Sequence, residues 1–166
     1  MRIAFYAPLK PPDHPVPSGD RQLARALAAA LAAAGHEVDV AARFRSYDRH
    51  GSAARQQRLR TVGARLAARA LRRLATPALR PDVWFTYHLY HKAPDWLGPP
   101  ISAALGIPYV VAEASIAGKQ RDGPWAIGHA GATAAITAAT AVVSVNPADV
   151  AAIRALRRDA ADDLLL

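Results

Sequence analysis

Cysteine is absent from the 166 residues of the sequence. Its absence excludes disulfide bonds, thiolate nucleophiles and cysteine-ligated zinc, and it is typical of proteins in a reducing compartment. A chain of this length buries enough apolar surface to fold without disulfides or metals. We therefore expect a cytoplasmic protein whose core is stabilised by burial alone.

Long apolar runs are also missing. A membrane-spanning helix needs roughly 20 apolar residues, and the alanine-rich stretch at residues 23–34 is interrupted by Arg25. The first apolar run ends at Pro8, which is too early for the core of a secretory signal peptide. Any contact with a membrane is therefore expected to be peripheral, at its inner face.

Acidic side chains are scarce in one segment. Between Arg43 and Arg80 the sequence has eleven arginines and one acid, Asp48, whereas the rest of the chain has ten basic and twelve acidic residues. The net charge of +8 therefore arises locally, as expected for a basic surface patch.

Strand and helix patterns alternate along the chain. Leu23, Leu27 and Leu31 fall four residues apart, which indicates one face of a helix. The predicted strands are residues 2–7, 36–42, 83–87, 108–112 and 141–145, and the predicted helices are 20–34, 53–74, 101–105, 125–137 and one from 147. Strand–helix–strand units place parallel strands side by side. We predict an α/β fold, a Rossmann-like doubly wound parallel sheet of about five or more strands with helices on both faces.

The end of the sequence begins another apolar run. Asp162 and Asp163 lead directly into three leucines at residues 164–166. We expect residues 1–166 to form a single domain and the protein to continue beyond it.

The loop after the first strand is a candidate phosphate site. Ligands of parallel sheets bind beyond the carboxyl ends of the strands, where helix N-termini begin. Ser18 and Gly19 start the first helix, and Lys10 lies in the same loop. The loop lacks the GxGxxG fingerprint of dinucleotide-binding proteins, so a simple turn with Ser18 as helix cap remains the alternative.

Aromatic and imidazole side chains follow the third predicted strand. His88, Tyr90, His91 and Lys92 all come at its carboxyl end, where rings and imidazoles suit stacking and hydrogen bonding with a sugar. The alternative is that a histidine is packed or faces solvent. No metal site is predicted, because His88 and His91 lack an obvious third ligand.

A carboxylate follows the fourth predicted strand. Glu113, with Ser115 close behind it, is placed to orient a hydroxyl group or to act as a base. The alternative, which the spacing supports equally, is that Glu113 caps a helix or pairs with a nearby arginine. Asn146 follows the fifth strand and caps the last helix, with Pro147 at its first position.

The second predicted helix carries most of the basic patch. Arg65, Arg69 and Arg73 follow one another at intervals of four residues, and Arg58 precedes them on the same helix. Like charges at this spacing repel, which an anionic membrane surface would offset. A solvated arginine face is the alternative, and nucleic acid is disfavoured because the segment has no interleaved aromatic residues and no helix-turn-helix pattern.

Six segments of the sequence have an order and spacing that are characteristic together. They are MRIAFYAP, SGDR, AAGHEVDVAAR, PDVWFTYH, LGIPYVVAEAS and ATAVVSVNPAD. In this order they resemble the amino-terminal domain of GT-B glycosyltransferases, over nearly the whole chain. The similarity is to the large retaining group, the group 1 or family 4-like enzymes.

The resemblance implies transfer of a hexose from a nucleotide diphosphate sugar to a hydroxyl of a glycan or lipid acceptor, with retained configuration. The nucleotide sugar would be a co-substrate, and no metal or other cofactor is implied. In such enzymes a carboxyl-terminal domain binds most of the donor. That domain would lie outside these 166 residues, and the fragment alone would be inactive.

The same resemblance implies roles for single residues. Ser18 and Gly19 resemble the glycine-rich loop near the donor phosphates, and His88 resembles a cleft residue. Glu113 stands where many relatives have a histidine near the reacting sugar, and Asn146 stands where they have a polar residue. A different class of function also remains open, a stand-alone Rossmann-like module that binds a nucleotide or a protein without catalysis.

Overall fold

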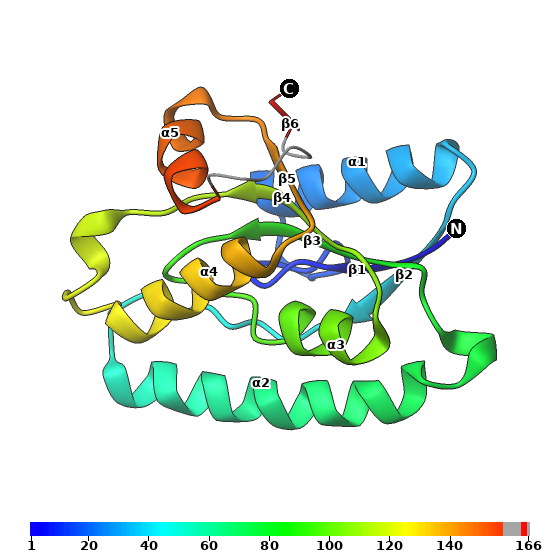
Figure 1. Ribbon diagram of the computed structural model, residues 1–166, viewed down its shortest axis with the longest axis horizontal. Helices are drawn as coiled ribbons and strands as arrows, with labels where there is room; N and C mark the ends of the chain where they lie inside the picture. The colour runs from blue at the N-terminus through cyan, green and yellow to red at the C-terminus, as the bar shows by residue number, and fades with distance from the viewer. Residues whose placement is uncertain (158–163, 166) are drawn as a thin grey trace.

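One parallel sheet forms the centre of the molecule (Figure 1). The computed structural model describes residues 1–157 and 164–165. Its strands are β1 (Arg2–Tyr6), β2 (Glu37–Ala42), β3 (Val83–Leu89), β4 (Tyr109–Ala114), β5 (Ala141–Ser144) and β6 (Leu164–Leu165). They are ordered β2-β1-β3-β4-β5-β6 and all pair in parallel. The predicted α/β class and Rossmann-like sheet are confirmed.

Helices cover both faces of this sheet. In Figure 1, α1 lies above the sheet, and α2, α3 and α4 lie below it. The helices are α1 (Gly19–Ala33), α2 (Ala53–Leu74), α3 (Gly98–Leu105), α4 (Ala126–Ala138) and α5 (Pro147–Leu156), with short 3-10 turns at Pro77–Leu79 and Gly118–Gln120. Helix α5 packs against α4 and β5. Helices α1 to α4 each connect two parallel strands, as in a doubly wound fold.

A small apolar cluster joins α1 to its face of the sheet. Phe5 and Tyr87 are buried there with Ala24 of α1. The rings of Phe5 and Phe85 stack on neighbouring strands, 5.6 Å apart. Alanine at position 24 lets the helix approach the sheet closely, and this fixes the start of α1 near the ends of β1 and β3.

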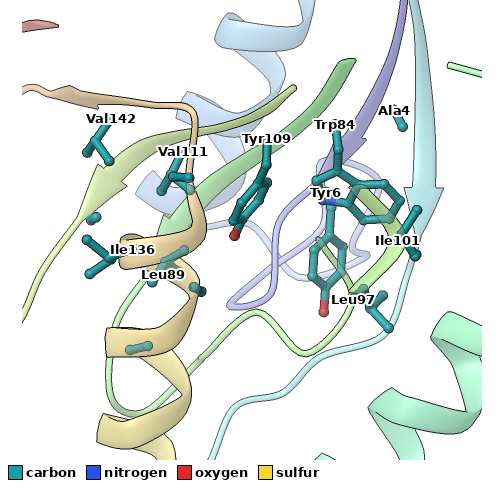
Figure 2. Close-up of a cluster of buried hydrophobic side chains, with 14 of the residues drawn as sticks. Ala4, Tyr6, Trp84, Leu89, Leu97, Ile101, Tyr109, Val111, Ile136 and Val142 are labelled. Atoms are coloured by element: carbon teal, nitrogen blue, oxygen red, sulfur yellow. The ribbon is translucent and has the colours of Figure 1, made fainter. Parts of the chain in front are cut away.

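A larger core lies between the sheet and helices α2, α3 and α4. Trp84, Tyr6 and Leu97 lie close together at its centre, as Figure 2 shows. The rings of Tyr6 and Trp84 are 6.1 Å apart, and both side chains are fully buried. The packing of α4 requires glycine at position 131, because a Cβ on Gly131 would lie 2.3 Å from the ring of Trp96 and clash with it.

A buried carboxylate organises the start of α3. Asp95 is 2% exposed and accepts hydrogen bonds from the hydroxyl groups of Thr86 (2.6 Å) and Tyr109 (2.9 Å). It also accepts from the backbone N–H groups of Leu97 (2.7 Å) and Gly98 (2.8 Å). Burial raises the pKa of Asp95, and these hydrogen bonds oppose the rise. The network ties β3, β4 and α3 together beneath the ends of the strands.

Some element boundaries differ from those expected from the sequence. Strands β3 and β4 run two residues further than predicted, to Leu89 and Ala114. Helix α3 begins at Gly98 instead of residue 101, because prolines are tolerated in the first turn of a helix. Leu164–Leu165 pair with β5 as a sixth strand, whereas residues 162–163 lie outside the described part of the chain.

Candidate functional site at the strand ends

The carboxyl ends of the central strands form one rim of the sheet. Four parallel strands lie next to one another in the order β1, β3, β4 and β5. The segments that follow these strands in the sequence therefore meet on the same side of the sheet. Helix α1 follows β1 and has Asp20 in its first turn, and α5 follows β5 and has Asp149 in its first turn. The rim therefore combines two helix N-termini with the residues that end β3 and β4.

His88 and Glu113 have left-handed backbone conformations on adjacent strands. Their φ angles are 56° and 60°, in a region that residues other than glycine rarely occupy. In the β3–β4 pairing Tyr87 lies opposite Ala112 and Leu89 opposite Ala114, so both strands are irregular at the same level. Such a conformation costs roughly 1–3 kcal/mol for each residue and is most often found at functional sites.

His88 is held by a carboxylate from another element. Its Nδ1 lies 3.0 Å from Oδ1 of Asp20, and its ring contacts those of Tyr87 and Tyr90. Because a carboxylate only accepts hydrogen bonds, Nδ1 carries the proton, and a neutral His88 has an unprotonated Nε2. That nitrogen is available to accept a hydrogen bond from a ligand.

Glu113 has an unsatisfied oxygen. Its Oε2 is buried but has no hydrogen-bond partner within the described part of the chain. Burial raises the pKa of Glu113, the carboxylates of Asp149 and Asp20 raise it further, and His88 lowers it. A buried acceptor without a partner is costly, and a carboxylate of raised pKa is a better proton acceptor near neutral pH. Glu113 is thus suited to bind and activate a hydroxyl group.

A band of rings continues from His88 along the rim. Tyr90 contacts both His88 and His91, with ring centroids 5.3 and 5.2 Å away, and His91 in turn contacts Trp125 at 5.7 Å. The Lys92 ammonium lies 4.6 Å from the centre of the Trp125 ring. Burial raises the pKa of Tyr90 to about 12. The predicted residues Tyr90 and Lys92 therefore belong to one half-buried aromatic surface, which we call the aromatic band.

The loop before α1 has the expected helix cap. The Ser18 hydroxyl accepts a hydrogen bond from the backbone N–H of Arg21 at 3.2 Å, so the predicted capping role is confirmed. A Cβ added at Gly19 would meet no atom within 4 Å, which means that the space beside this residue is open. Lys10 is half-buried in the same loop and makes no ion pair with any residue that the structure describes.

Ser115 and Asn146 are engaged by the backbone around the rim. The N–H of Ser115 donates to the carbonyl of Leu89 at 3.1 Å and continues the β3–β4 pairing. Asn146 caps α5 through Ala148 and donates to the carboxylate of Asp149 at 2.9 Å. Asn146 therefore holds one of the carboxylates that raise the pKa of Glu113.

The predicted arginines of α2 lie on its exposed surface. Arg58, Arg65, Arg69 and Arg73 are all exposed. Only the last two line a groove of about 630 Å³ between α2 and the edge of the sheet. Its lining residues are Ala41, Ala42, Arg43, Phe44, Leu66, Arg69, Ala70, Arg72, Arg73, Trp84 and Leu97. We call it the arginine groove.

Sequence reasoning missed Asp20 and Asp149 as members of the site. Asp20 lies at the positive end of α1, where an acidic side chain is favourable for the helix alone. Both aspartates occupy the first turn of a helix that directly follows a strand of the sheet. That shared position was the available signal, because all such first turns meet at the same rim.

The described residues contain no group of three or more histidine, aspartate or glutamate side chains arranged to hold a metal ion. None of the helices in the described ranges is both long and apolar enough to cross a bilayer.

The sequence matches the model of a known protein family. Residues 18–163 match the model of the family described as "Glycosyl transferase 4-like domain". The matched region contains Ser18, His88, Glu113 and the arginine groove, whereas β1 and Lys10 precede it. No curated protein matches the sequence.

Proposed function

Because the chain belongs to the glycosyl transferase 4-like domain family, we propose that its rim binds an acceptor hydroxyl for transfer of a hexose from a nucleotide diphosphate sugar. One observation carries this proposal. The buried, unpartnered Oε2 of Glu113 lies at an irregularity shared by two adjacent strands. A ligand hydroxyl would satisfy that oxygen once the side chain turns or the atoms that cover it move aside.

Glu113 is the proposed acceptor-binding carboxylate. It accepts the hydrogen bond of the acceptor hydroxyl and takes its proton as the oxygen bonds to the anomeric carbon. The bond between that carbon and the diphosphate breaks, and the configuration is retained. His88 hydrogen-bonds the reacting sugars through Nε2, and Asp20 positions its ring from the other side. The aromatic band, with Tyr90 and Lys92, provides a stacking surface for the acceptor sugar.

The donor phosphates are proposed to lie against the N-terminus of α1. The space at the Cβ position of Gly19 is open, and backbone N–H groups at a helix start stabilise phosphate. Lys10 and Ser18 belong to the same loop, and Ser115 and Asn146 border the cleft. The nucleotide sugar acts as co-substrate, without a metal or another cofactor. We also propose that a second domain, outside these 166 residues, binds the rest of the donor, and that this chain alone is inactive.

The exposed arginines of α2 support a cytoplasmic location of the protein, bound to the inner face of a membrane. An anionic surface would offset the repulsion among Arg58, Arg65, Arg69 and Arg73. The acceptor would then be a membrane-associated glycan or lipid.

A nucleotide- or protein-binding module without catalysis is the second candidate function. The start of α1 at Gly19, with open space at the Cβ position of this residue, is compatible with it. Thermal-shift titrations separate the two functions. A response to NAD or to an acidic protein, with none to any nucleotide sugar in the two-domain protein, would favour the binding module.

The test of the transfer proposal uses the two glutamates of the sequence, Glu37 and Glu113. Glu37 lies on the edge strand β2 and pairs with Arg2. In the two-domain enzyme, Glu113→Ala is expected to lower kcat about a hundredfold or more, and His88→Ala to lower it strongly as well. The control Glu37→Gln should leave kcat unchanged. Equal kcat for wild type and both rim variants would refute the proposed site.

A further inference from the structure

The arginine groove combines two chemistries in one depression. Its apolar floor is formed by partly exposed side chains, and the buried Trp84 and Leu97 also belong to its lining. The partly exposed residues are Ala41, Ala42, Phe44, Leu66 and Ala70. Its border contains guanidinium groups of α2. The groove is distinct from the strand-end rim, because none of the rim residues Asp20, His88 or Glu113 lines it.

The border arginines from α2 are poorly neutralised. Arg69 and Arg73 make no ion pair with any residue in the described ranges. Arg72 also has no ion pair among the described residues, and it donates to the carbonyl of Ala68, one turn earlier. Arg43, which reaches the groove from the loop after β2, pairs with Asp13. Three guanidinium groups without an ion pair to a described residue therefore lie beside an apolar floor.

This combination matches the two parts of an anionic lipid. A phosphate accepts charge-assisted hydrogen bonds from guanidinium groups in a planar, bidentate geometry. An acyl chain gains free energy when apolar surface covers it. A free phosphate would leave the floor unused, and a neutral chain would leave the guanidinium groups unpaired.

We propose that the arginine groove binds one anionic lipid molecule, with its phosphate between Arg69 and Arg73 and its acyl chain over Ala70 and Leu66. The proposal builds on the membrane association suggested above and makes it specific. A diffuse basic face would use all exposed arginines of α2 equally. A groove uses Arg69 and Arg73, while Arg58 and Arg65 serve as ordinary surface charges.

Calorimetric titration of the 166-residue protein with dihexanoyl phosphatidic acid, below its micelle concentration, tests this assignment. Wild type should bind one molecule. The double variant Arg69→Glu/Arg73→Glu should bind at least about tenfold more weakly, because both charge-assisted contacts are lost. The matched control Arg58→Glu/Arg65→Glu makes the same charge change on the same helix outside the groove. Its affinity should fall clearly less than that of the groove variant, because neither residue lines the groove, although Arg65 lies one turn from Arg69.

A third variant tests the apolar floor without changing charge. Ala70→Phe fills the groove and should weaken lipid binding, while circular dichroism and the unfolding temperature check that the variant is folded. Inorganic phosphate should bind wild type much more weakly than the lipid. Three results would each overturn the proposed lipid site. The two double arginine variants could lose the same affinity for the lipid, or wild type could bind inorganic phosphate as tightly as the lipid. The third result is that wild type binds no lipid.

Vesicle sedimentation and transfer assays separate this site from the proposed function. Lipid binding in the groove without association with phosphatidylglycerol vesicles would remove the membrane location and leave the groove in place. Vesicle association without one-to-one lipid binding would remove the groove as a lipid site and leave the membrane location in place. Transfer to a soluble acceptor should be unchanged in Arg69→Glu/Arg73→Glu, because the groove lies apart from the rim.

Discussion

Two carboxylates in two regions of the molecule have pKa values raised by burial but have opposite surroundings. Burial raises the pKa of both Asp95 and Glu113. Asp95, in the core, has four hydrogen-bond donors from β3, β4 and the start of α3. Glu113, at the rim, has a buried oxygen without a donor and a left-handed backbone.

The difference shows how to separate structural from functional carboxylates in this fold. A raised pKa alone does not distinguish them, since desolvation acts on both. Hydrogen bonding does, because a satisfied carboxylate stabilises its surroundings and an unsatisfied one is suited to a ligand. Substitutions in the core and at the rim test whether the two carboxylates differ in this way.

The largest effect on stability is expected in the core. Asp95→Ala removes the acceptor of Thr86, Tyr109 and two backbone N–H groups, so it should lower the free energy of unfolding by about 3 kcal/mol or more. Urea denaturation measures this change. The control Asp82→Ala removes an exposed acceptor of the Arg2 N–H and should cost less than about 1 kcal/mol. Similar costs for both variants would mean that the Asp95 network is not structural.

Asp20 should affect catalysis and pH dependence more than folding. Asp20→Asn weakens the support of His88 and should lower kcat of the two-domain enzyme about tenfold. It also removes a negative charge that raises the pKa of Glu113. The acidic limb of the pH–rate profile should therefore move to lower pH. An unmoved profile with normal kcat would exclude Asp20 as a positioning residue.

The contribution of the Glu113 side chain to the free energy of unfolding is expected to fall as the pH rises. Because its pKa in the folded protein lies above the ordinary 4.5, the folded state binds more protons than the unfolded state just above that pH. The stabilisation from protonated Glu113 is complete at low pH and is lost as the pH rises through the folded pKa. Glu113→Gln should thus equal wild type in stability near pH 4 and exceed it at pH 7. Lower stability of the variant at pH 7 would show that the carboxylate is structural.

Gly19 should matter for the ligand and not for the fold. Since a Cβ at this position meets no protein atom, Gly19→Ala should change the unfolding temperature little. The added methyl group narrows the approach to the helix N-terminus, so KM for the nucleotide sugar should rise several-fold with kcat little changed. Unchanged KM would place the donor phosphates elsewhere.

The order of strands and helices was predictable because apolar periodicity and turn residues set it locally. Even the bounds of α2, Ala53–Leu74, agree with the expected helix. The start of α3 was missed because the proline pair at residues 99–100 looked like a loop.

The chemistry of the rim was predictable only in part. His88 and Glu113 were chosen because they follow apolar strands. Their shared left-handed conformation was not visible, since neither is a glycine and the effect depends on the register of β3 and β4. The contact of Asp20 with His88 spans 68 residues of sequence, and the arginine groove requires α2 to pack along the sheet edge. Both arise from tertiary structure.

The position of the acceptor hydroxyl in a complex tests the central claim most directly. A crystal structure of the two-domain enzyme with acceptor and an inert donor analogue would give this position. The account predicts that the hydroxyl lies within about 2.6–3.2 Å of the Glu113 carboxylate, with the acceptor sugar on the aromatic band. An acceptor bound away from Glu113, with Oε2 still unpartnered, would contradict it.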